Sequence, residues 1–410
     1  MRPFEGSELD IMRIRAIETI QLPEHPHHLF VQIHTDEGVS GLGETFPRPS
    51  SSAAVIHDVF AGMLLGKNPL EIERHWRDMF QAIHYHGFAG TEIRALSAID
   101  MALWDILGKA SNLPVYRLLG GKCRDEIPVY NTCVSHGPYR DHEWFTTRPE
   151  ELALSLLADG IHGMKIWPFD ELSVKTGGQS ISKEDLAWGV QLVERIRKAV
   201  GDQMEIAIEG HCCWNLPAAI KIAHALEPYD VMWYEDLMPP DPIGSLKQLR
   251  DATTTPICAS ERLFTRFQFL PLLEQHAVDI VMPDIAWVGG ISEMKKIATL
   301  ASSYHLPIAP HNCGGPVINL ANAHICANVP NLFICESVRA FYNTYFQDIV
   351  THPIQMKNGC MQVPESPGLG AELLPELLKR DDLIRKVTTE AVNTHWTSGD
   401  PWKDDLGDRF

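Results

Sequence analysis

The sequence predicts an α/β protein in which a (β/α)8 barrel carries an α+β capping domain. Two observations predict the barrel. From about Val129 onward eight short apolar runs alternate with helical patterns. Glu209 and Glu235 end two of these runs, Glu261 directly follows a third, and the three glutamates have a constant spacing of 26 residues. One strand-helix unit needs about that length. A third observation, the mixed strand and helix pattern of the first 125 residues or so, predicts the capping domain.

The first part of the chain contains a hairpin and a long helix. The stretch "LFVQIHTDEGVSGLGE" predicts a strand over 29–35, a turn at "DEG" and a return strand over 41–44. In "RALSAIDMALWDILGKA" the apolar residues recur at helical spacing, which predicts a packed helix. We assign residues 1–127 to the capping domain.

The eight apolar runs of the predicted barrel are "VYNTCV", "HGMKIW", "EIAIE", "VMWYE", "PICAS", "DIVMP", "PIAP" and "LFICE". Helical stretches such as "SKEDLAWGVQLVERIRKAV" and "SEMKKIATLASSYH" separate them. We assign residues 128–345 to the barrel. The segment 346–410, with "PESPGLGAELLPELL", predicts loop and helix that return to the capping domain.

Composition excludes several classes of function. The 410 residues are 45% hydrophobic and 21% charged, as in an ordinary globular enzyme. A net charge of -18 speaks against a nucleic-acid partner or an anionic membrane surface. The nine cysteines show no CxxC spacing, and the first 20 residues lack an apolar signal region. We therefore expect a cytoplasmic protein without disulfides and without a membrane span.

The three evenly spaced glutamates predict a metal site. A single acid at a strand end is more often a cap or a salt-bridge partner, but carboxylates on three consecutive strands reach the same rim of a barrel. Such charges raise one another's pKa unless a cation lies between them. All-oxygen ligands suit Mg²⁺ first and Mn²⁺ or Ca²⁺ next.

Other strand ends carry further candidates. Asp284 directly follows the run "DIVMP", and His311 directly follows "PIAP" on the neighbouring strand. Asp284 is therefore placed to accept the ring N–H of His311. The alternative is a core histidine bonded to a backbone carbonyl. Glu336 closes the last run. His211 follows Glu209 by two residues, and strand alternation predicts that both side chains point the same way.

Lys165 and Trp167 share one face of the second predicted strand. Lys165 is either a functional cation or a salt-bridge partner of one of the acids. Trp167 is either a substrate contact or a packing residue.

Taken together, these strand-end residues and the motifs "GLGE", "AIDMALWDILGK", "VGGI" and "PGLG" resemble the enolase superfamily, and more narrowly its mandelate racemase-like subgroup. The resemblance covers nearly the whole chain. It implies a capping domain, built from the N-terminal part and the C-terminal tail, over a barrel. It also implies removal of the proton α to a carboxylate, with Mg²⁺ stabilising the enediolate.

Carried over position by position, the resemblance makes Glu209, Glu235 and Glu261 the metal ligands. It makes His311 the base, oriented by Asp284. Glu336 becomes the group that hydrogen-bonds the substrate carboxylate.

Two positions depart from the racemase pattern. Trp167 stands where a Lys-x-Lys strand would supply a second base. His211 stands where racemases have Asn, as in acid-sugar dehydratases similar to galactonate dehydratase, and an imidazolium suits protonation of a leaving hydroxyl. We expect a dehydratase of an aldonate or aldarate that yields a 2-keto-3-deoxy acid.

Two alternatives remain open. One is an epimerase that uses Lys165 as second base, and the other is a binding protein without turnover. For substrate contacts the resemblance points to loops of the capping domain, here "LPEHPHHLF" (22–30) and 46–52, and we expect contact from one histidine, His25. The segment "SHGPYRDHEWFTTRPEE" also has the length to reach the pocket. We expect a homo-oligomer, as is common in the family.

Overall fold

The capping sheet joins both ends of the described chain, residues 12–389 of the computed structural model. Its four antiparallel strands run in the order β13, β1, β2, β3. Their bounds are Ile14–Leu22 for β1, His25–Thr35 for β2, Ser40–Thr45 for β3 and Ile384–Thr389 for β13. Residues 1–11 and 390–410, which belong to the segments expected at 1–127 and 346–410, lie outside the described residues. The exact domain boundaries stay a prediction.

The predicted hairpin is confirmed, because β2 and β3 pair from Leu29↔Thr45 to His34↔Ser40. The expected cap loop 22–30 is wrong in its conformation. Leu22 pairs directly with His25 across a two-residue turn, so most of this stretch is strand. Cross-strand pairing provides partners for backbone groups that a loop would leave to water.

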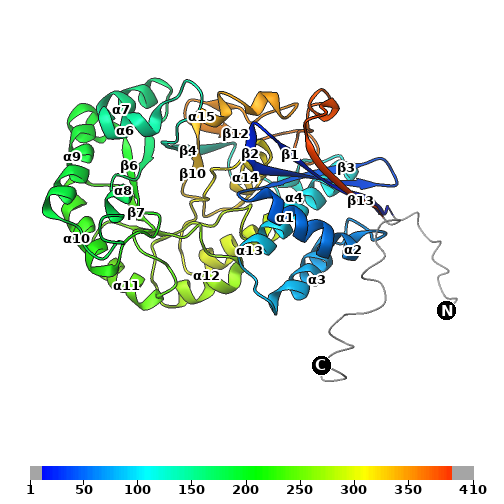
Figure 1. The fold of residues 1–410 in the computed structure, drawn as a ribbon, viewed down its shortest axis with the longest axis horizontal. Coiled ribbons are helices and arrows are strands. Elements are labelled where there is room, and N and C mark those ends of the chain that lie inside the picture. Colours follow the sequence, from blue (N-terminus) through cyan, green and yellow to red (C-terminus); the bar gives the residue numbers. More distant parts are fainter. Residues whose placement is uncertain (1–11, 390–410) are drawn as a thin grey trace.

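Helices cover one face of this sheet (Figure 1). The predicted helix is α4 (Thr91–Ala110), and its neighbours are α1 (Pro49–Val55), a π-helical turn (Ile56–Phe60), α2 (Ala61–Leu64), α3 (Ile72–His84) and α5 (Val115–Leu118). Glycine lets β3 approach α4 closely. A Cβ at Gly43 would lie 1.9 Å from the carbonyl oxygen of Ala98, so no larger residue fits there.

The barrel strands pair in parallel in chain order from β4 to β9, and β10 pairs with β4. Their bounds are Glu126–Thr132 (β4), Gly163–Ile166 (β5), Glu205–Glu209 (β6), Trp233–Glu235 (β7), Ile257–Ala259 (β8), Ile280–Val281 (β9) and Cys335–Ser337 (β10). The predicted strand "PIAP" forms no regular strand. Ile308 makes isolated bridges to Val281 and Leu332 instead. Pro307 and Pro310 lack the N–H that a regular ladder requires.

Helices alternate with these strands and surround them (Figure 1). They are α6 (Asp141–Thr147), α7 (Pro149–Ala158), α8 (Asp170–Ser173), α9 (Lys183–Val200), α10 (Leu216–Leu226), α11 (Ile243–Asp251), α12 (Thr265–Glu274), α13 (Gly290–Ser303), α14 (Pro316–Asn328) and α15 (Arg339–Tyr342). Both helices predicted from sequence, α9 and α13, are present. Ser182 caps α9 by accepting a hydrogen bond of 3.0 Å from the backbone N–H of Asp185.

The C-terminal part contains β11 (Met356–Lys357) and β12 (Cys360–Gln362), and β12 pairs antiparallel with the first residues of β4. The helix expected in "PESPGLGAELLPELL" is wrong, since this stretch holds only a 3₁₀ turn at Leu377–Lys379. Three prolines in the stretch remove donors that a helix interior needs. Within residues 12–389 no helix is both long and apolar enough to span a membrane.

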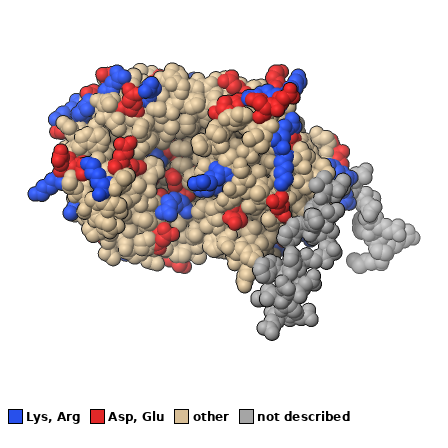
Figure 2. All heavy atoms as spheres, in the orientation of Figure 1, with Lys and Arg blue, Asp and Glu red and all other residues tan. Residues whose placement is uncertain are grey.

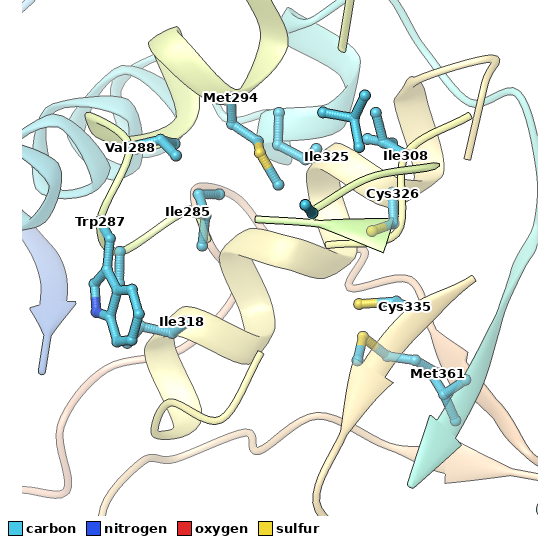
Figure 3. Close-up of a cluster of buried hydrophobic side chains, with 14 of the residues drawn as sticks. Ile285, Trp287, Val288, Met294, Ile308, Ile318, Ile325, Cys326, Cys335 and Met361 are labelled. Atoms are coloured by element: carbon cyan, nitrogen blue, oxygen red, sulfur yellow. The ribbon is translucent and has the colours of Figure 1, made fainter. Parts of the chain in front are cut away.

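The main hydrophobic core fills the space between the barrel strands and their helices. Figure 3 shows one part of it, where Ile318 and Ile325 of α14 lie among side chains from the segments after β9 and from β10. Trp287, at one side of this cluster, also borders the site described next.

Candidate active site

Three carboxylates converge at the carboxyl ends of consecutive barrel strands. Glu209 and Glu235 are the last residues of β6 and β7 and pair in register, and Glu261 follows β8 by two residues. One oxygen of each carboxylate lies within 4.8 Å of the other two. Glu209 and Glu235 are fully buried. The even spacing in the sequence therefore does bring the three side chains together.

Lys165 lies among these acids. Its Nζ is 3.3 Å from Glu209, 2.8 Å from Glu336 and in contact with Glu235. Burial opposes its charge, but Glu235 and Glu336 hold the pKa of Lys165 well above its usual range. Lys165 is thus a buried ammonium ion held by carboxylates.

One ammonium ion does not neutralise this cluster. Burial raises the pKa of Glu209 to about 7, although Lys165 is near. Burial and the charge of Glu209 raise the pKa of Glu235 well above its usual range. A buried set of hard oxygen donors with excess negative charge fits a divalent cation such as Mg²⁺, with Glu209, Glu235 and Glu261 as the residues that would hold it.

The histidine and aspartate predicted as a pair are hydrogen-bonded. His311 Nδ1 lies 2.6 Å from Asp284 Oδ2, and Asp284 Oδ1 accepts the backbone N–H of Ala286 at 2.7 Å. The other ring nitrogen, Nε2, is 2.9 Å from Glu261 and 3.5 Å from Glu336. Asp284 therefore fixes Nδ1 and leaves Nε2 directed at the carboxylate cluster.

These contacts shift the pKa of both partners. Burial alone would lower the pKa of His311, but the charges of Glu261 and Glu336 raise it well above its usual range. Burial works against the charge of Glu261, yet His311 and Lys165 lower the pKa of that carboxyl to about 2. These contacts favour the imidazolium form of His311, paired with Glu261.

His211 occupies a turn beyond the end of β6, with a left-handed φ of 39°. Its backbone N–H donates to Glu209 Oε1 at 2.7 Å, and its ring Nδ1 contacts Asp170 at the start of α8. The expectation that strand alternation directs His211 is wrong, since the strand ends at Glu209 and the turn sets the direction. Burial would lower the pKa of His211, but the hydrogen bond and charge of Asp170 raise it.

Three residues of the site were missed in the sequence. Asp170 holds His211, Thr132 donates its hydroxyl to Glu336, and the backbone N–H of Asn312 donates to Glu336 at 2.7 Å. Thr132 ends β4, so the strand-end rule applied to hydroxyls as well as acids would have found it. Asp170 ends the quoted stretch "GMKIWPFD", but no pattern in the chain connects it to His211, 41 residues later.

Trp167 and His25 lie in two different groups of rings. Trp167 stands edge-on to His211, with ring centroids 5.7 Å apart, and packs on Phe145. His25 stacks on Tyr345 at 4.2 Å and lies near His136 of the first barrel loop. The structure therefore places Trp167 beside the predicted acid and His25 in a cluster between the cap and the barrel.

The charge on the surface follows no single pattern. Figure 2 shows Lys and Arg beside Asp and Glu on the visible face, separated by wide neutral areas. Among the described residues on this face, no continuous basic surface of the kind that binds nucleic acid is present.

Comparisons with known proteins agree with this geometry. The sequence profile described as "Mandelate racemase / muconate lactonizing enzyme, N-terminal domain" matches residues 16–120, and "Enolase C-terminal domain-like" matches residues 149–377. The D-xylonate dehydratase of Haloferax volcanii is 32% identical over 91% of this chain and 92% of its own length. The D-galactonate dehydratase of Ralstonia nicotianae is 30% identical over 88% and 92%.

Solved structures give the same result. An enolase of the mandelate racemase subgroup from Agrobacterium tumefaciens superimposes with a TM-score of 0.86 and 44% identity, over 93% of this chain and all of that one. The barrel with its capping domain, as predicted from the sequence, is thereby confirmed. The profiles, the relatives and the fold together establish that this chain is a member of the enolase superfamily, with the two domains of the mandelate racemase and muconate lactonizing enzymes.

Proposed function

We propose that the protein is an Mg²⁺-dependent dehydratase of a sugar acid, an aldonate or an aldarate, that forms a 2-keto-3-deoxy acid. The observation that carries the proposal is the presence of two imidazole-carboxylate pairs, His311–Asp284 and His211–Asp170, at the rim that holds the three glutamates. Dehydration needs one group to remove a proton and another to protonate the leaving hydroxyl. The relatives named above are dehydratases, which supports the same class of reaction for this chain.

The base in this proposal is His311. Its Nε2 points at the carboxylate cluster, and Asp284 holds the opposite nitrogen, which favours uptake of a proton at Nε2. Deprotonated His311 removes the proton α to the substrate carboxylate. Mg²⁺ held by Glu209, Glu235 and Glu261 would supply Lewis-acid stabilisation of the negative charge on that carboxylate.

The acid is His211. Its side chain is 45% exposed, so the ring is accessible to a substrate hydroxyl. Asp170 accepts the Nδ1–H and keeps the ring charged, and Nε2–H donates the proton to the leaving hydroxyl.

Glu336 fits its expected role only in part. It accepts hydrogen bonds from Thr132, Asn312 and Lys165, so its carboxylate is already satisfied as an anion. Burial opposes that charge, but Lys165 and His311 lower the pKa of Glu336. We assign Glu336 to positioning Lys165 and His311 around the substrate carboxylate rather than to donating a proton.

The epimerase alternative requires Lys165 as a second base. A neutral amine is needed for that task, whereas Lys165 is bonded to three carboxylates that favour its ammonium form. Trp167 also occupies the place of the second strand residue that would supply such a base. The geometry therefore supports elimination better than epimerisation.

The test is a screen of aldonates, aldarates and acids derived from uronates with Mg²⁺, read as 2-keto acid by semicarbazone absorbance and repeated with EDTA. We expect a metal-dependent product from at least one substrate. Exchange of the α-proton in D₂O without any keto acid would reject the dehydratase and favour the epimerase. The cytoplasmic location and the homo-oligomer stay predictions.

A further inference from the structure

An arginine without a counter-ion borders the site. Arg94 is the fourth residue of α4, and its Cζ lies 4.7 Å from the ring centroid of Trp287 and 5.9 Å from that of Phe264. Its Nε is buried and has no hydrogen-bond partner among residues 12–389. Within the same part of the chain, Arg94 forms no ion pair with any carboxylate. A cation half removed from water without a partner is costly.

The position of Arg94 ties it to the reaction centre. The Trp287 ring on which it stacks is also 5.3 Å from the His311 ring. Trp287 follows β9 and Phe264 follows β8, so both belong to loops at the carboxyl ends of the strands, where the glutamates also lie. Trp287 is held in place because its Nε1 donates to the carbonyl oxygen of Phe46 at 2.6 Å.

A second arginine of the cap, Arg48, adds positive charge around Arg94. Arg48 lies in the loop after β3 with a left-handed φ of 67°, and its charge repels that of Arg94. The negative charges that act on Arg94 are those of Asp284 and Glu261, both of which are already bonded to His311. The positive charge of Arg48 adds to the attraction that Arg94 exerts on an anion.

We propose that Arg94 binds a second carboxylate at the end of the substrate that is remote from the reacting carbon. This inference rests on the proposed function and narrows it to aldarates in preference to aldonates. A guanidinium carries parallel N–H donors whose geometry matches the two oxygens of a carboxylate. Because Trp287 packs against both the Arg94 guanidinium and the His311 ring, Arg94 lies beside the reaction centre, where the remote end of a substrate with its α-carbon at His311 would reach it.

Binding is measured first, because it does not depend on turnover. The His311→Asn variant with Mg²⁺ is titrated calorimetrically with aldarates and aldonates of matching configuration, alone and combined with Arg94→Met. We expect Arg94→Met to weaken aldarate binding roughly 10- to 100-fold, as for loss of a charge-assisted hydrogen bond, and to leave aldonate binding nearly unchanged. Arg94→Lys should restore part of the loss.

Turnover gives the second readout. In the otherwise native enzyme, Arg94→Met should lower the ratio of kcat/KM for aldarates to that for aldonates by a similar factor. Arg74→Gln is the matched control, since Arg74 is an exposed arginine paired with Glu71. It should leave the ratio unchanged.

The outcomes separate the two proposals. If aldarates bind in an Arg94-dependent manner but nothing is dehydrated, the carboxylate subsite is supported and the proposed dehydratase activity is rejected. If Arg94→Met changes aldarates and aldonates equally, or neither, the subsite is rejected. If an aldonate with a terminal phosphate ester binds more tightly than every aldarate, the assignment of a carboxylate is overturned.

Discussion

At the scale of single residues, the two histidines have separable tasks. We expect His311→Asn to abolish both α-proton exchange and dehydration, because removal of the proton comes first. His211→Asn should retain exchange and lose dehydration by roughly 10²- to 10⁴-fold, the usual contribution of general acid catalysis. Exchange is followed by NMR in D₂O and dehydration by semicarbazone absorbance. Equal loss of exchange in both variants would overturn this division of roles.

The sequence predicts most of the acids and histidines at the centre of the site, and few of the residues that surround them. Glu209, Glu235 and the His311–Asp284 pair were predictable, because parallel strands of a barrel end at one rim. Asp170, Asn312 and Arg94 were not, since loops and a helix of the other domain position them. Backbone geometry in loops depends on contacts that a pattern of single residues does not encode.

At the scale of elements, Glu44 joins the cap to the barrel. This fully buried residue of β3 accepts hydrogen bonds from the backbone N–H groups of Val317 and Ile318 at 2.9 and 3.1 Å, in the first turn of α14. Its other oxygen lies 2.8 Å from His28 Nδ1. The carboxylate therefore caps a helix of the other domain, where the helix dipole favours negative charge.

We expect Glu44→Gln to lower the free energy of unfolding by about 1–3 kcal/mol, because an amide loses the charge and cannot accept at both ends. Chemical denaturation measures this loss. Glu37→Gln, at an exposed position of the hairpin turn, is the control and should have little effect. If Glu44→Gln had the same free energy of unfolding as the wild type, the contact would make no net contribution to stability.

Some helices and strands were predicted correctly from the sequence and others were not. The hairpin and α4 followed from apolar periodicity and turn residues, which act locally. The seventh barrel strand did not form as predicted, because the run "PIAP" carries a proline at each end. An apolar run predicts burial at that place, whereas regular pairing also requires free N–H groups.

At the scale of the whole molecule, metal binding should stabilise the fold. Mg²⁺ binds the folded cluster and has no such site in the unfolded chain, so saturation raises the melting temperature by linkage, with about 2.7 kcal/mol expected at 100 times Kd. Differential scanning calorimetry with Mg²⁺ and with EDTA measures this shift. Glu235→Ala should remove most of the shift, and an unchanged shift would remove Glu235 from the set of ligands.

The contact between cap and barrel should also respond to pH. Asp100 of α4 is buried, and it accepts the hydroxyl and the backbone N–H of Ser292 in α13 at 2.6 and 3.0 Å. Burial raises its pKa to about 7, from 3.8. The folded protein thus binds a proton that the unfolded chain releases, so this contribution to stability is full below about pH 4 and is lost as the pH rises through 7.

Asp100→Asn should flatten the slope of the unfolding free energy between about pH 4 and 7, on the order of a few kcal/mol over that interval. The amide has no charge to desolvate, its oxygen can still accept the backbone N–H of Ser292, and its NH₂ group can donate to the Ser292 hydroxyl oxygen. Urea denaturation across that range measures the slope, and Asp78→Asn, on the exposed face of α3, is the control. The same slope in wild type and Asp100→Asn would contradict the assignment.

The pairing of β13 with β1 makes the capping sheet dependent on the last strand of the described chain to be synthesised. All barrel strands are translated between β1 and β13, so a nascent chain can form the glutamate cluster before its cap sheet is complete. Until then the buried strand β1 presents an unpaired edge, which is a template for association with other chains. Polypeptides released early, before residue 384, would therefore be recognisable to chaperones and proteases by this edge, even though they contain every residue of the glutamate cluster.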